Sequence, residues 1–334
     1  MFTLNTIKSF LVISSFVMTT LLFTACSARV VPAVVSNQTK LIPLGTTFLT
    51  TQSVSSVFAV AWSPDGKHLA LGHADGSVQV CDATTGKIDF TVQGQSSHVW
   101  ALSWSPDGKR LASASWDHTV QVWDASTGTS LLTYRGHTDL VLAVAWSPDG
   151  TRIASPGSDH TVQVWDATSG QHMITYRGHS STVESLAWSP DGSRIASASF
   201  DHTVQVWDAT TGDHLLTYRG HTDYVWAVAW SPDGQHIASG GMDDTVQVWY
   251  ATTGKRTLIY HGHTNAIQAL AWSPDGTRLA SGSWDTTVQV WNATTGQQIF
   301  TYRDSADLIS SLAWSPDGKR IASVDNQVRV WEAS

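Results

Sequence analysis

The pentapeptide Trp62-Ser63-Pro64-Asp65-Gly66 (WSPDG) occurs seven times in the chain. Its copies begin at Trp62, Trp104, Trp146, Trp188, Trp230, Trp272 and Trp314, and neighbouring copies are always 42 residues apart. A repeat of about 20 to 50 residues marks stacked supersecondary units, because one unit cannot bury its apolar face alone. Within the pentapeptide, Pro presets φ, Asp bonds the backbone and Gly takes the left-handed conformation. Each copy therefore predicts a tight turn between two strands.

The copy at residues 137–178 shows what lies between these turns. Runs that favour strands occupy residues 141–146, 152–155, 161–165 and 172–176. In the third run, TVQVW, apolar and polar side chains alternate with the period of two that a strand requires. Four short antiparallel strands per repeat are typical of one propeller blade. The sequence therefore predicts an all-β fold, a seven-bladed propeller.

The composition favours one repeat domain and argues against several functions. Thirteen of the 17 Trp residues occupy two fixed repeat positions, at the pentapeptide and at the end of the third strand. The net charge is −8 and the bases form no stripe, so we expect no nucleic-acid partner. The two cysteines, Cys26 and Cys81, lie in different settings, which excludes a disulfide framework. His118, His160 and His202 repeat about one blade apart, which is too far for them to share one ion, so we expect no metal. We also expect no cofactor.

Two dipeptides in fixed register identify a family resemblance. Trp-Asp ends the third strand at 123–124, 165–166 and 207–208, and becomes Trp-Tyr, Trp-Asn, Trp-Glu or Cys-Asp in the other copies. Gly-His precedes the first strand at 136–137, 178–179, 220–221 and 262–263. The chain thus resembles the WD-repeat β-propeller family over about 290 residues. The resemblance implies a ring whose channel mouth commonly binds partners, and we expect a monomeric propeller.

The way in which the ring closes can also be predicted. The seventh repeat has no fourth strand between Trp331 and Ser334, whereas the strand-like run TTFLTT, residues 46–51, precedes the first pentapeptide. This run should complete the last blade and so leave no open edge at the seam. The seventh copy is also two residues short between Ser323 and Asp325, which predicts a tighter turn.

The first 25 residues differ from the rest. Lys8 is the only charged residue before Arg29, and residues 10–23 are mostly apolar. This run is shorter than the roughly 20 residues that span a bilayer, and it has the layout of a secretory signal peptide. The following Cys26 resembles the lipid-modified cysteine of a bacterial lipobox, although Phe23 stands where Leu is usual. The alternative is cleavage after Ala28, which leaves a soluble secreted protein.

These features give three segments: a signal peptide at 1–25, a tether at 26–44 and the propeller at 45–334. We expect export across the cytoplasmic membrane and a lipid anchor at Cys26 at the cell envelope, with the membrane reached only through that anchor. The tether, fully extended, reaches at most about 60 Å.

Each of the four complete repeats contains a His, a Ser, an Asp and a Trp at fixed offsets. Out of context this set suggests a hydrolase, but a catalytic site is one constellation in one cleft, and this set occurs four times. The family resemblance implies a hydrogen-bonded tetrad instead, so we expect no catalytic residue. The sets are His137, Ser155, Asp159, Trp165; His179, Ser197, Asp201, Trp207; His221, Ser239, Asp243, Trp249; and His263, Ser281, Asp285, Trp291.

The repeats nearest the seam depart from the tetrad. Ser53, Gln95 and Ser305 replace its His, Leu71 replaces its Ser and Cys81 replaces its Trp. We expect Cys81 to be a small buried apolar residue without reactivity.

Differences among nearly identical repeats point to a binding surface. The most variable positions lie three and five residues after the Gly-His histidine and just before the tetrad Asp, and they hold all four Trp residues outside the two fixed positions. By resemblance these positions surround the channel mouth. Aromatic residues and Met are enriched at interfaces, so we expect an exposed partner-binding patch, although variation in packing between blades would be the simpler explanation. The patch comprises Phe58, His98, Trp100, Trp116, Leu140, Leu142, Glu184, Phe200, Tyr224, Trp226, Met242, Gln268, Trp284 and Leu308.

The sequence thus predicts a non-catalytic scaffold that binds a protein or peptide. Two other classes stay open. Aromatic rings also stack on sugars, so a glycan- or small-molecule-binding propeller is one alternative. An enzyme would need a single acid–base cluster, and Glu184, the only acid of the patch, has no carboxylate partner there.

Overall fold

A computed structural model describes residues 43–51 and 55–333. The chain separates into two units, residues 1–41 and residues 42–334. The predicted signal peptide, Cys26 and most of the predicted tether lie outside the described residues, as does Ser53. Within the described part, no helix is long and apolar enough to cross a membrane.

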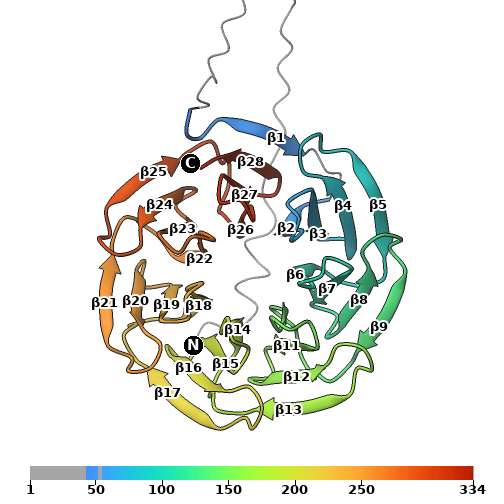
Figure 1. Ribbon diagram of the computed structural model, residues 1–334, viewed down its shortest axis with the longest axis horizontal. Helices are drawn as coiled ribbons and strands as arrows, with labels where there is room; N and C mark the ends of the chain where they lie inside the picture. Colours follow the sequence, from blue (N-terminus) through green and yellow to red (C-terminus); the bar gives the residue numbers. More distant parts are fainter. Residues whose placement is uncertain (1–42, 52–54, 334) are drawn as a thin grey trace, which may run out of the picture. The chain divides into compact units, whose positions relative to one another are not determined.

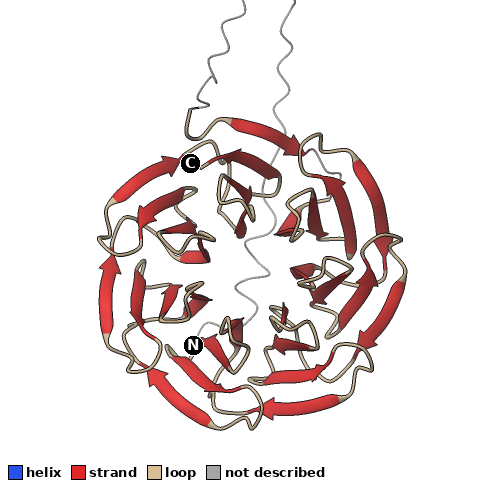
Figure 2. Ribbon diagram, viewed as in Figure 1, coloured by secondary structure: helices blue, strands red, loops and turns tan. Residues whose placement is uncertain are grey.

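The described residues form β-strands joined by turns (Figure 2). The strands are β1 Thr47–Thr51, β2 Val57–Trp62, β3 His68–His73, β4 Ser77–Asp82, β5 Ile88–Gln93, β6 Val99–Trp104, β7 Arg110–Ser115, β8 Val120–Asp124, β9 Ser130–Tyr134, β10 Ala145–Trp146, β11 Arg152–Pro156, β12 Val162–Asp166, β13 His172–Tyr176, β14 Val183–Trp188, β15 Arg194–Ser199, β16 Val204–Asp208, β17 His214–Tyr218, β18 Val225–Trp230, β19 His236–Gly241, β20 Val246–Tyr250, β21 Arg256–Tyr260, β22 Ile267–Trp272, β23 Arg278–Ser283, β24 Val288–Asn292, β25 Gln298–Tyr302, β26 Ser311–Trp314, β27 Arg320–Val324 and β28 Val328–Glu332.

The strands of the described residues pair into seven antiparallel sheets of four, which stand around one axis as the blades of a propeller (Figure 1). Six sheets follow chain order, from β2-β3-β4-β5 to β22-β23-β24-β25, and the seventh has the order β1-β28-β27-β26. The first strand of each blade lies at the centre and the fourth at the rim. The predicted seven-bladed architecture is confirmed.

The pentapeptide forms the predicted turn between the first and second strands. In the first copy, the Ser63 hydroxyl donates to the Asp65 carboxylate at 2.6 Å, and the same carboxylate accepts the backbone N–H of Lys67. Gly66 has a φ of 69°, in the left-handed region that a residue without Cβ enters most easily. The turn between the first and second strands of each blade is therefore specified by the local sequence.

Two kinds of contact join neighbouring blades. Tyr134, at the end of β9, stacks on Trp165 of the next blade with 4.6 Å between ring centroids. On the pentapeptide side, the Arg152 guanidinium lies 4.7 Å over the Trp188 ring and donates to the carbonyls of Ala209 and Gly192 at 2.8 and 3.0 Å. The Trp residues at the two fixed positions therefore join neighbouring blades, because each ring packs against a side chain of the adjacent blade.

Blade 3 differs from the strand prediction. Residues 141–146 were expected to form one strand, but β10 covers only Ala145–Trp146, with a separate bridge between Val141 and Gly157. The cause is Pro156 on the neighbouring strand, which stands where five of the other blades have Ala or Gly and the seventh has Val324. Proline has no N–H to donate across the ladder, so the pairing of the innermost strand is interrupted there.

The ring closes through β1, as predicted. β1 pairs with β28 in antiparallel register, with Leu49 opposite Val330. In blade 1 the equivalent pair is Phe90 opposite Val80, so Leu49 and not Phe48 occupies the inward position. Phe48 is instead 42% exposed at the rim. The seventh blade makes the expected shorter turn: Val324 pairs with Val328, whereas the equivalent pair in blade 1, Gly72 with Val78, encloses two more residues.

Candidate functional site

The structure brings the four residues of each predicted tetrad together. His179 bonds the Asp201 carboxylate through Nδ1 at 2.8 Å and the Ser197 hydroxyl through Nε2 at 2.8 Å. The Trp207 indole N–H donates to the same hydroxyl at 3.3 Å. The sets that begin at His137, His221 and His263 have the same arrangement, with imidazole–carboxylate distances of 2.8–2.9 Å.

The tetrad carboxylates stay ionised within the fold. Burial alone would raise the pKa of Asp201, but hydrogen bonds from His179 and Thr203 hold that pKa well below its ordinary value. The carboxylate oxygen that bonds His179 also accepts the backbone N–H of Ser180, so Asp201 ties the loop before the first strand to the turn after the second strand. Each acceptor of this network is engaged inside the blade, which matches the expected tetrad geometry.

The blades without the full set use substitutes that the sequence reasoning missed. In blade 2, Gln95 donates to the carbonyls of Ser113 and Thr119 at 3.2 and 3.3 Å. In blade 7, Arg329 stands where the other complete blades have Gln, and its guanidinium contacts the Asp325 carboxylate. The signal was present in the sequence, as VRVW in place of VQVW. In blade 1, Cys81 is 1% exposed, and burial raises the pKa of its thiol to about 11.

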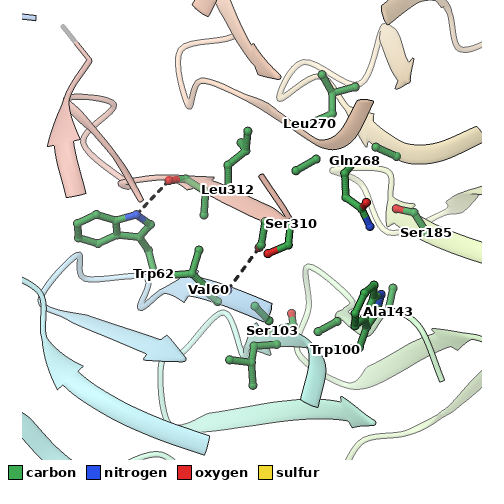
Figure 3. Close-up of a pocket in the computed structure, with 18 of the residues that line it drawn as sticks. Val60, Trp62, Trp100, Ser103, Ala143, Ser185, Gln268, Leu270, Ser310 and Leu312 are labelled. Carbon is green, nitrogen blue, oxygen red and sulfur yellow. Dashed lines mark hydrogen bonds between the residues drawn. The ribbon is translucent and has the colours of Figure 1, made fainter. Parts of the chain in front are cut away.

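A cavity of about 520 Å³ lies among the first strands at the centre of the ring. Small residues from all seven blades line it: Ala59, Ala101, Ala143, Ser185, Ala227, Ala269 and Ser311. Figure 3 shows Ala143 and Ser185 among them. The neighbouring position, five residues after the Gly-His histidine, supplies residues that differ from blade to blade: Trp100, Leu142, Glu184, Trp226, Gln268 and Ser310. Equivalent positions in the seven repeats form a column around the axis. One column therefore sets the width of the channel, and the column before it determines which chemical groups line the channel.

The aromatic residues of the predicted patch gather in two clusters. In the first, the Trp100 ring lies 5.3 Å from Phe58 and 4.9 Å from Trp116, and Trp116 lies 4.8 Å from His98. In the second, Phe200 stacks on Tyr224 at 4.6 Å, and Trp226 lies 4.6 Å from Trp284. The residues of each cluster come from different blades and meet at the mouth.

The expected exposed patch is wrong in one respect. Phe58, Leu142 and Trp226 are buried, at 9%, 7% and 7% exposure, because neighbouring rings and the curvature of the ring cover them. Leu308 is 37% exposed, and the remaining members of the patch, Leu140 and Met242 among them, are partly buried. The mouth is thus a lined channel with a rim and not a flat apolar surface.

Glu184 connects the two sides of the channel. Its carboxylate accepts the Trp100 indole N–H at 3.4 Å, although the two residues belong to blades 4 and 2. Burial raises the pKa of Glu184 to about 7, and the bond from Trp100 lowers it only in part. The mouth therefore holds a carboxylate whose charge is poorly compensated.

Other polar atoms at the mouth differ in how they are paired. The Trp284 indole N–H donates to the Gln268 side chain at 2.7 Å. The indole N–H groups of Trp116 and Trp226 and the hydroxyl of Ser158 are buried without a hydrogen-bond partner. Unpaired buried donors destabilise a fold by about 1–3 kcal/mol each, so the mouth is built at some expense of stability.

Comparison with protein families agrees with this architecture. The model of the WD domain, G-beta repeat, matches residues 86–124, 128–166, 170–208, 212–250, 254–292 and 296–332. The chain belongs to the WD40 repeat family. The model of the anaphase-promoting complex subunit 4 WD40 domain also matches, over residues 45–99. A comparison with curated proteins finds no match.

WD40 propellers are commonly scaffolds for protein interactions and are generally not catalysts. Among the described residues of this WD40 propeller, no group of three or more His, Cys, Asp or Glu side chains is placed to hold a metal ion. The Ser, His and Asp residues that could suggest a hydrolase are engaged with one another inside the blades. The features particular to this chain are therefore at the channel mouth.

Proposed function

We propose that this WD40 propeller is a non-catalytic scaffold that binds a protein or peptide partner at the channel mouth. The observation that carries the proposal is the central cavity, which is lined by the variable column of the repeat and bordered by two aromatic clusters. Its volume of about 520 Å³ lies within the usual range of ligand pockets, about 300–1,000 Å³. A side chain of a partner fits such a cavity, while the rest of the partner lies across the rim.

The border of the mouth supports this proposal, because it carries apolar side chains that do not belong to the aromatic clusters. Leu140, Met242 and Leu308 lie at the mouth outside the aromatic clusters, and Leu308 is among the large exposed apolar residues. Exposed apolar residues that border a cavity usually mark an interaction site. Changing these three residues removes contact area without removing a ring from the clusters.

The experiment is capture of the protein on an array of short random-sequence peptides. The triple variant Leu140→Asn, Met242→Gln, Leu308→Asn should weaken the binding of captured peptides at least about tenfold, because binding energy concentrates in a few contacts. The substitutions add no charge, so a loss would reflect the apolar contacts.

A matched control exists on the outer edge of the propeller, where the fourth strands lie. Leu131, Met173 and Leu215 are 53%, 52% and 52% exposed on the fourth strands, far from the mouth. The variant Leu131→Asn, Met173→Gln, Leu215→Asn makes the same chemical change there and should leave peptide capture unchanged. Equal losses in both variants, or capture of glycans but not of peptides on parallel arrays, would reject the proposal.

We also propose that the protein is exported and anchored to the cell envelope by a lipid on Cys26. The support is the sequence alone: an apolar segment that ends in LFTAC and then a stretch of about 18 residues without repeats. Such an anchor would present the propeller to partners at the membrane surface.

A further inference from the structure

We propose that the mouth contains a cation-binding subsite, in which Glu184 and the rings of Trp100 and Trp226 receive the charged end of a lysine or arginine side chain. This inference rests on the proposed function, because the side chain would belong to the peptide partner. It specifies what that partner must present to the channel.

The first argument is the charge of Glu184. Among the described residues that line the cavity, Glu184 is the only one with an ionisable side chain, so no Lys, Arg or His of this lining neutralises it. Its one hydrogen bond among the described contacts comes from the Trp100 indole, at 3.4 Å. A desolvated carboxylate with so little compensation is costly. A cationic ligand would supply the missing partner, whereas an anionic one would be repelled.

The second argument is the surroundings of the carboxylate. Trp100 and Trp226 line the same cavity as Glu184. Phe58 and Trp116 hold the Trp100 ring in place from 5.3 and 4.9 Å, and Trp284 supports Trp226 from 4.6 Å. Aromatic faces carry negative potential and attract ammonium and guanidinium groups, most strongly where water is excluded. The rings that line the cavity together with Glu184 therefore favour a ligand of the same charge, positive, as the carboxylate does.

The third argument is that the site is single. The column that supplies Glu184 holds Phe58, Trp100, Leu142, Trp226, Gln268 and Ser310 in the other blades. None of these is charged, so the near-sevenfold symmetry of the ring is broken by one acid. The subsite accordingly takes one cationic group per propeller, at the side where blades 2 and 4 approach each other through the bond between Trp100 and Glu184.

The experiment compares two small probes of nearly equal shape, N-acetyl-lysine amide and N-acetyl-norleucine amide. Each is titrated into the full-length protein at about pH 8, and the fluorescence of the mouth indoles reports binding. The lysine probe should bind at least about tenfold more tightly than the norleucine probe, a difference of ~1.4 kcal/mol. In Glu184→Gln, which keeps the shape of the side chain, this preference should disappear.

A second measurement does not depend on any variant. Because burial raises the pKa of Glu184 to about 7, the wild-type carboxyl becomes neutral in mildly acidic solution while the probe amine stays charged. Trp100, Leu142 and Trp226, which line the cavity from the facing elements, do not ionise. The lysine preference should therefore fall toward equal affinity for the two probes as the pH is lowered below 7.

Equal affinity for the two probes at pH 8, or a preference that persists in Glu184→Gln, would overturn the subsite. Peptide capture that depends on Leu140, Met242 and Leu308 but not on lysine or arginine would leave the proposed function intact and remove only the subsite. A lysine preference without any peptide capture would remove the proposed function and keep the subsite as a site for small cations.

Discussion

Replacing Glu184 by Gln should stabilise the protein, and the gain should depend on pH. In the fold, burial raises the pKa of Glu184 from its ordinary value of 4.5 to about 7. A carboxyl group whose pKa is raised on folding costs no stability below its unfolded pKa. The fold loses stability as the pH rises from 4.5 to 7, because the unfolded chain releases this proton first. Above pH 7 the loss is complete.

The size of the effect follows from the shift. The difference between 4.5 and about 7 corresponds to about 3 kcal/mol at 1.36 kcal/mol per unit. This is an upper limit, because the side chain is only partly buried, and solvent screens a charge that is partly exposed. Glutamine keeps an oxygen that can accept the Trp100 indole N–H, so the hydrogen bond need not be lost.

The assay is urea unfolding of the wild type and of Glu184→Gln at several pH values. The two proteins should be nearly equal at about pH 4, and the variant should become more stable by up to about 3 kcal/mol at about pH 8. Asp304→Asn, which removes an exposed charge, controls for the change in net charge. A variant that is less stable than the wild type at pH 8, or a difference that does not change with pH, would refute the argument that Glu184 is an uncompensated charge.

Three further predictions concern the frame and the anchor. His179→Ala leaves the Asp201 carboxylate and the Ser197 hydroxyl without their imidazole partner and should lower the free energy of unfolding in urea by about 1–3 kcal/mol. Gln95→Ala removes a side chain whose partners are backbone carbonyls and should lower it clearly less. Equal losses would mean that the tetrad does not stabilise the blade. Arg152→Met removes two hydrogen bonds and a cation–π contact to the next blade but keeps an apolar stem over Trp188, and should lower stability by ~1–3 kcal/mol. An unchanged unfolding midpoint would show that this contact is not what joins the blades. Cys26→Ser should move the full-length protein from the detergent phase to the aqueous phase on partitioning, and identical partitioning of both proteins would exclude the lipid anchor.

Much of the fold follows from the sequence alone. The 42-residue period fixes seven blades, and the pentapeptide fixes the turn between the first two strands of each. The strand-like TTFLTT run that precedes the first pentapeptide predicts the closure by β1. These features depend on backbone preferences and on the alternation of side chains, which are properties of short stretches of chain.

The sequence was less informative where one residue alters a repeated pattern. Pro156 shortens β10. It lies on β11, the strand that pairs with β10, and proline has no backbone N–H to donate to that partner. Arg329 takes over contact with Asp325 in a blade that has Ser305 in place of His. Both positions can be read from the alignment of the repeats, but their consequence depends on which group across the sheet is left without a partner.

The site itself was decided by the tertiary structure. The sequence selected the variable columns, yet it did not show that Trp226 would be buried or that Glu184 would bond Trp100 across 84 residues. The burial, pairing and charge environment of these side chains depend on the curvature of the closed ring. That curvature brings seven equivalent positions around one axis, where side chains from blades that are not neighbours in the sequence meet in a space of about 520 Å³.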